Sequence, residues 1–249
     1  MRKYISLLMT ALLALTTACE KDTTPLPEKD EAIPAPVDMG IYVKGKNVKW
    51  ASHNLGATKE SEIGNYYAWG ATARYKNYDW RKYPWSNDDG TRFSKYCANT
   101  GTQASWWNAE GEADGHSVLL PEDDIAHKKL KGSWRMPTKE EVEALLATQH
   151  SPYYIWVKGY EMDGTVGVYI SYTKDGASQH IFLPRAGRRN GDQVEFDKER
   201  GYYASSTQSE GATGGPDGCF NLGLEKTADA GLWSNSRCYG YSIRPVYVE

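Results

Sequence analysis

The sequence predicts an α+β fold in which two short helices pack on twisted antiparallel hairpins joined by long loops. Three observations indicate this class: a helix start with an amphipathic stripe, strand-like runs separated by Asp-Gly turns, and a long aromatic segment without a helical or strand period. The chain has 249 residues and a net charge of -3. A chain of this length can bury a hydrophobic core that is stable without disulfides or metal ions. The slightly negative net charge argues against nucleic acid as a partner.

The clearest helix signal covers residues 138–146. Thr138 is followed three residues later by Glu141, and this capping-box spacing satisfies backbone donors at the start of a helix. The apolar residues that follow share one helical face: Val142, Leu145 and Leu146. We therefore expect a helix whose inner face packs on the core, preceded by an extended segment that carries Trp134.

A second helix is expected to start at Pro121, since proline suits the first helical turn. Acidic residues occupy its start and lysines precede Gly132, which matches the helix dipole at both ends.

The strands are expected mainly in the second half of the chain. The dipeptides Asp163-Gly164 and Asp175-Gly176 favour tight turns between antiparallel strands. The strand-like runs are residues 154–157, 166–172, 180–183, 201–207, 219–224 and 241–248, and two short runs lie within residues 37–57.

Aromatic residues with a polar edge are unusually frequent, with 18 Tyr and 9 Trp against 4 Phe. Such rings suit surfaces that contact polar partners. Many of them lie in residues 71–118, where long loops in a compact domain tend to be functional.

The N-terminus has the pattern of an exported, lipid-anchored protein. A short basic start and an apolar run too brief to span a bilayer precede small residues and Cys19. This arrangement resembles a bacterial lipobox, so residues 1–18 are interpreted as a lipoprotein signal peptide and Cys19 as the lipidated residue, the alternative being simple secretion with a free thiol. Residues 19–36 are rich in Pro and charged residues and predict a flexible tether.

Residues 37–249 resemble the Fibrobacter succinogenes major paralogous domain, a family common in Bacteroidetes lipoproteins. The resemblance is carried in order by residues 37–40, 49–51, 54–57, 66–70, 122–124, 134–138, 183–187, 201–206 and 242–246. It implies a C-type lectin-like fold and an outer-membrane lipoprotein at the cell surface. Such a protein contacts the membrane only through the lipid at Cys19.

Similarity of the C-terminal stretch to C-type lectins implies a disulfide between Cys219 and Cys238, which leaves Cys97 unpaired. A lectin-type calcium site is not expected, because Gly215 and Ser234 stand where calcium-binding oxygens are required. The five histidines show no paired metal spacing, so neither a metal nor another cofactor is predicted.

The favoured hypothesis is a non-catalytic, surface-anchored binding module that recognises an extracellular glycan or protein. Indoles can stack on sugar faces while amide and guanidinium groups bond to hydroxyls. The candidate ligand-binding residues are Trp106, Trp107, Arg188, Arg189, Trp233 and Asn235. Two alternatives remain: an oxidoreductase related to the formylglycine-generating enzymes that uses Cys219 and Cys238, and a purely structural envelope or adhesion subunit.

Overall fold

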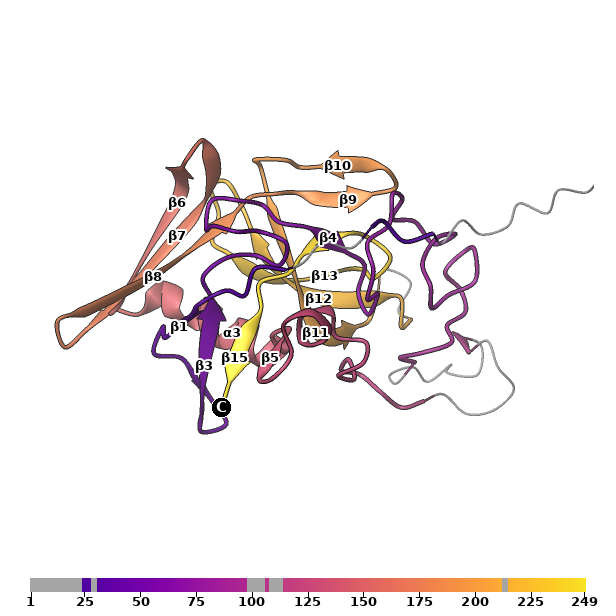
Figure 1. Cartoon of the computed structure of the whole chain (residues 1–249), viewed down its shortest axis with the longest axis horizontal. Coiled ribbons are helices and arrows are strands. Elements are labelled where there is room, and N and C mark those ends of the chain that lie inside the picture. The colour runs from indigo at the N-terminus through magenta and orange to yellow at the C-terminus, as the bar shows by residue number, and fades with distance from the viewer. Residues whose placement is uncertain (1–23, 28–30, 98–105, 108–113, 212–214) are drawn as a thin grey trace, which may run out of the picture.

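The computed structural model describes residues 24–27, 31–97, 106–107, 114–211 and 215–249. These residues form several small β-sheets and few helices, which confirms the coarse fold class (Figure 1). The predicted signal peptide and Cys19 lie outside the described residues.

A five-stranded sheet brings the two ends of the domain together. Its strands are hydrogen-bonded in the order β1-β3-β15-β5, and β2 pairs with the first two residues of β3, Lys46 and Asn47. The strands are β1 (Pro36–Val37), β2 (Tyr42–Val43), β3 (Lys46–Ala51), β5 (Trp134–Arg135) and β15 (Val246–Val248). As expected, Trp134 lies in an extended segment and packs in the core.

A second five-stranded sheet, in the order β13-β12-β11-β14-β4, forms the centre of the molecule. Its strands are β4 (Tyr66–Tyr67), β11 (Gly201–Ser209), β12 (Gly218–Leu224), β13 (Gly231–Ser236) and β14 (Tyr241–Ser242). The helix α3 (Lys139–Ala147) packs against β11, β12 and β13. Its residues Val142 and Leu145 are fully buried in one core cluster with Leu222 and Leu224 of β12.

The helix starts differ in how well they match the sequence prediction. The capping box of α3 is present: Thr138 Oγ1 accepts from Glu141 N–H, and Glu141 Oε2 accepts from Thr138 N–H at 2.8 Å. The other helix, α2 (Ile125–Leu130), starts later than Pro121 because Asp124 is its N-cap and accepts from the N–H groups of residues 126 and 127. A 3-10 helix, η1 (Thr148–His150), follows α3.

Both predicted hairpins are confirmed in a three-stranded sheet at one side of the molecule (Figure 1). It contains β6 (Tyr154–Met162), β7 (Thr165–Lys174) and β8 (Ala177–Pro184). Asp163 and Gly164 have φ values of 49° and 81°, and Asp175 and Gly176 have 52° and 81°. Positive φ at both central residues is the geometry of a type I′ turn, which fits the twist of antiparallel strands.

A buried arginine holds the loop region of residues 71–97, at the end of the molecule away from this sheet (Figure 1). Arg237 is fully buried and donates to the carbonyl oxygens of Tyr96 and Lys95 at 2.8 and 2.9 Å. Its guanidinium carbon lies 3.8 Å from the ring centroid of Phe93. These contacts order a segment that has no periodic secondary structure.

Of the predicted tether over residues 19–36, the structure describes residues 24–27 and 31–36, and hydrogen bonds join them to the domain. Leu26 N–H donates to the Arg74 carbonyl at 2.8 Å, and the Arg74 guanidinium donates to the Pro27 carbonyl at 2.6 Å. Tyr67 Oη donates to Glu31. Backbone groups of a Pro-rich segment can thus bond to another part of the chain without burying a core of their own.

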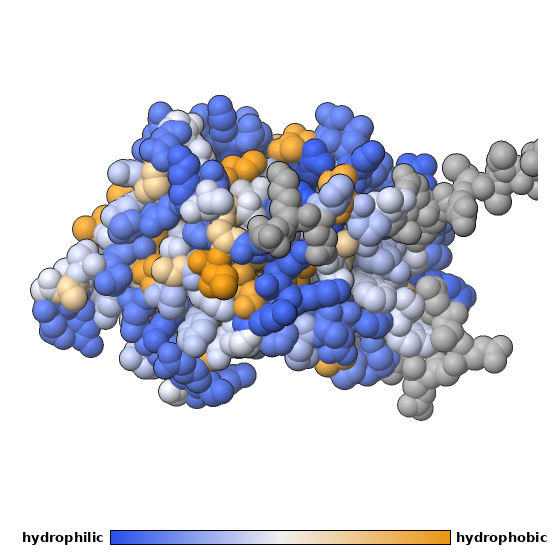
Figure 2. Space-filling view, in the orientation of Figure 1, coloured by the Kyte–Doolittle hydropathy of each residue, from blue (hydrophilic) through white to orange (hydrophobic). Residues whose placement is uncertain are grey.

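Hydrophilic residues cover most of the face shown in Figure 2, and hydrophobic residues gather only in small groups there. Among the described residues, no helix has both the length and the apolar character needed to cross a bilayer.

Candidate binding site

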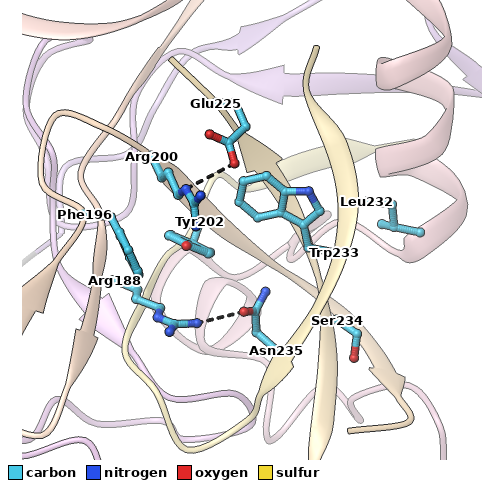
Figure 3. A pocket seen from close by; sticks show the side chains of 9 residues that line it. All are labelled: Arg188, Phe196, Arg200, Tyr202, Glu225, Leu232, Trp233, Ser234 and Asn235. Carbon is cyan, nitrogen blue, oxygen red and sulfur yellow. Dashed lines mark hydrogen bonds and ion pairs between the residues drawn. The ribbon is translucent and has the colours of Figure 1, made fainter. Parts of the chain in front are cut away.

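One pocket lies where the hairpin of β9 (Arg188–Asn190) and β10 (Gln193–Glu195) meets the sheet strands β11, β12 and β13 (Figure 3). Its volume is about 470 Å³, which falls within the range of about 300–1,000 Å³ typical of small-ligand pockets. The lining residues are Arg188, Phe196, Arg200, Tyr202, Glu225, Leu232, Trp233, Ser234 and Asn235.

The indole of Trp233 lies flat on Gly223 of β12, and its edge lies near Gly231 of β13. Gly223 and Gly231 are register partners. A Cβ atom on Gly223 would lie only 2.0–2.2 Å from three central indole atoms, so the ring plane rests against this backbone. The ring also meets Tyr202 edge-on, with centroids 5.2 Å apart. Since Trp233 is only half-buried and lines the pocket, it forms an aromatic platform there.

A chain of hydrogen bonds fixes the polar end of the pocket. Arg188 Nη1 donates to Asn235 Oδ1 at 2.8 Å, and Asn235 Nδ2 donates to the buried Asn221 Oδ1 at 3.0 Å. Arg188 Nε donates to Glu195 Oε2 at 3.0 Å, and Asn190 donates to the other oxygen of this carboxylate. The bonds from Asn190 and then Arg188 lower the pKa of Glu195, so it stays ionised.

Aromatic rings enclose the Arg188 guanidinium. Its central carbon lies 4.5 Å from the ring centroid of Tyr239, 5.1 Å from that of Tyr202 and 5.5 Å from that of Phe196. Phe196 has a φ of 59°, in the left-handed region that non-glycine residues rarely adopt. This backbone conformation lies in the turn that follows β10 and places the ring between Arg188 and Arg200.

A second charged pair lies at the other end of the indole (Figure 3). Arg200 Nε contacts Glu225 Oε1 at 3.1 Å, and the two side chains remain 40% and 28% exposed. A hydrogen bond with Tyr202 is the main cause that raises the pKa of Arg200. The pair therefore presents a charged donor and a charged acceptor side by side within reach of a ligand.

The structure brings together three of the six predicted ligand-binding residues: Arg188, Trp233 and Asn235. Trp233 and Asn235 belong to the same strand, β13, in which side chains alternate. Both therefore point into the pocket, while the side chains of Leu232 and Ser234 point away from it (Figure 3). Arg189 follows Arg188 in β9 and instead lies over the Tyr66 ring at 6.0 Å.

The other two predicted residues, Trp106 and Trp107, do not line this pocket. Trp106 is half-buried and stacks on Phe93 with ring centroids 6.2 Å apart. Trp107 is half-buried beside the same residue, and its carbonyl accepts from Arg92. The Trp106 indole therefore packs on the loop region that Arg237 organises, and Trp107 joins the same region through its backbone.

The predicted disulfide is absent from the structure, where Cys97, Cys219 and Cys238 are free and buried thiols. The register of β12 and β13 places Asn235, not Cys238, opposite Cys219. The two thiols also belong to different core clusters. Burial raises the pKa of Cys219 well above its usual range and that of Cys238 to about 12, so both thiols stay protonated at neutral pH.

Sequence reasoning missed six residues that line the pocket: Phe196, Arg200, Tyr202, Glu225, Leu232 and Ser234. The alternation within residues 201–207 could have placed Tyr202 on one face of a strand, but no local pattern shows that this face of the sheet also carries Trp233.

Among the described residues, no group of three or more His, Cys, Asp and Glu side chains is arranged to hold a metal ion. Comparisons find no family model, no curated protein and no solved structure that matches this chain.

Proposed function

We propose that this protein is a C-type lectin-like binding module that recognises glycans through the Trp233 pocket. The observation that carries the proposal is the half-buried Trp233 indole, which lies flat on the Gly223 backbone and lines a pocket with fixed polar groups. An indole face suits the C–H face of a pyranose ring, and ordered amide and guanidinium groups suit its hydroxyls.

The polar groups support this proposal because hydrogen bonds within the protein hold them in place. The bonds of Asn235 to Arg188 and Asn221 fix its amide direction. Binding then loses less side-chain entropy than it would with mobile groups, and this favours affinity.

The proposal also places the protein on the outer membrane, facing outward and attached by a lipid at Cys19. The basic start, short apolar run and small residues before Cys19 support export and anchoring. In this setting the partner is an extracellular glycan, and the membrane is contacted through the lipid alone.

The test is a glycan array probed with the purified full chain, followed by titration of any glycan that binds. Replacing Trp233 by Ala removes the platform and is expected to weaken binding by more than about tenfold, while Trp233→Phe keeps part of it. Tyr42→Ala is the matched control, because Tyr42 is an aromatic residue that is 65% exposed on β2 and outside the pocket. Circular dichroism establishes that each variant is folded.

Unchanged glycan binding by a folded Trp233→Ala variant contradicts the assignment of this pocket. If no glycan binds the wild-type chain, the proposal fails and a protein ligand or a structural role takes its place. The oxidoreductase alternative gains no support from the site, because Cys219 and Cys238 are buried and their raised pKa values disfavour the reactive thiolate.

A further inference from the structure

The charged side chains of the pocket already have partners of opposite sign. Arg188 pairs with Glu195, and Arg200 pairs with Glu225. Two positive and two negative groups therefore balance, and the site lacks the excess of positive charge that attracts an anionic ligand.

The two pairs differ in how far a ligand can reach them. The Arg188 side chain is 16% exposed, lies among three aromatic rings and donates to Asn235 and Glu195. It acts as a fixed support beneath the pocket. Arg200 and Glu225 are 40% and 28% exposed, so this pair is the charged group that a ligand meets beside Trp233.

An adjacent guanidinium and carboxylate match two neighbouring hydroxyls of a sugar. Each hydroxyl both donates and accepts, so one can accept from Arg200 while the next donates to Glu225. A sugar carboxylate can only accept, and beside Glu225 it meets a like charge in a partly desolvated site.

Building on the glycan-binding function proposed above, we propose that the pocket selects an uncharged hexopyranose over an acidic sugar and that Glu225 determines this choice. The sugar places its C–H face on Trp233 and two neighbouring hydroxyls on the Arg200–Glu225 pair. Removing the Glu225 charge frees Arg200 for a ligand carboxylate.

The test compares neutral hexose oligosaccharides with hexuronic acid oligosaccharides of the same linkages, using the wild-type full chain, Glu225→Gln and Glu161→Gln. Glu161 is an exposed residue of β6 outside the pocket, so its variant controls for the loss of one negative charge. Wild type and the control are expected to prefer the neutral series. Glu225→Gln is expected to bind the acidic series about tenfold more tightly than wild type does, since a charge-assisted hydrogen bond becomes possible.

A second measurement does not depend on the variants. Binding of the neutral series by wild type is expected to change less than about twofold between low and high salt, because screening weakens interactions between charges and a neutral sugar carries none.

Tighter wild-type binding of the acidic series, or a strong fall of neutral-series binding with salt, overturns the inference while glycan binding at Trp233 stands. An unchanged preference in folded Glu225→Gln overturns the role of Glu225. If neither series nor any other glycan shows binding that depends on Trp233, the proposed function itself fails.

Discussion

Replacing Gly223 by Ala tests whether the indole of Trp233 lies on the backbone of β12. The new Cβ would lie 2.0 Å from Cδ2 and 2.2 Å from Cε2 and Cε3 of the ring. Non-bonded carbons settle at about 3.5–4.0 Å, so the ring must move by about 1.5 Å or more. Gly223 does not require positive φ, so alanine suits its backbone and the ring contact alone decides the outcome.

The cost of this overpacking is expected to be about 1–3 kcal/mol. Alanine also restricts the unfolded chain, which returns only about 0.4–1 kcal/mol. Destabilisation therefore wins, and in a domain of this size each kcal/mol lowers Tm by about 2–4 °C. The displaced platform should also weaken glycan binding by more than about tenfold.

Thermal unfolding followed by circular dichroism measures the loss of stability, and glycan titration measures the loss of binding. Gly231→Ala is the matched comparison, because its Cβ would meet only the edge of the same ring, at 3.2 Å from Nε1. Its effects should be clearly smaller. Equal Tm and equal affinity in Gly223→Ala and wild type would refute the flat placement of the indole.

Three further predictions concern the helix cap, the tyrosines and the thiols. Thr138→Ala removes the capping box of α3 and should lower the free energy of unfolding by about 1 kcal/mol in urea titrations; no change would mean that the cap is not formed. Burial raises the pKa of Tyr78 and Tyr203 to about 12, above the value of about 10 for an unfolded tyrosine. Below pH 10 both tyrosines are neutral in the folded and the unfolded chain. As pH rises from 10 towards 12 they ionise more easily in the unfolded chain, so each should lower the free energy of unfolding by up to about 3 kcal/mol. Unfolding curves from pH 8 to 12 check this, and constant stability over that range would contradict it. Burial also raises the pKa of Cys97 to about 11 and of Cys238 to about 12, so iodoacetamide should label them at pH 8 only in denaturant; rapid labelling of the native chain, read by mass spectrometry, would contradict their burial.

Local signals in the sequence predicted local structure well. The capping box at Thr138 and the Asp-Gly turns act through neighbouring residues, and each is present where it was expected. The start of α2 was predicted too early because Asp124 has an extended backbone and caps the helix. The acidic residue before it serves a tertiary contact instead: the Asp123 carboxylate pairs with Lys95 Nζ at 2.8 Å and accepts from Tyr96 Oη at 2.6 Å.

The pocket depends on contacts that no local pattern specifies. Arg188 and Asn235 are 47 residues apart and meet only because the β9–β10 hairpin lies beside β13. The residue types alone predicted these two side chains and Trp233 as binding residues. Side chains alternate along a strand, so Arg189, the neighbour of Arg188 in β9, lies away from the pocket. The disulfide was predicted wrongly for a similar reason, since only the register of β12 and β13 shows that Cys219 faces Asn235.

The contact of Leu26 with Arg74 limits how far the domain can stand from a membrane. If Cys19 carries the proposed lipid, the anchor lies seven positions before Leu26, and a fully extended chain of that length spans at most about 25 Å. A free segment from Cys19 to Pro36 would reach about 60 Å. With a lipid at Cys19 the domain should therefore stay close to the bilayer, and neutron reflectometry on supported bilayers would measure that standoff distance.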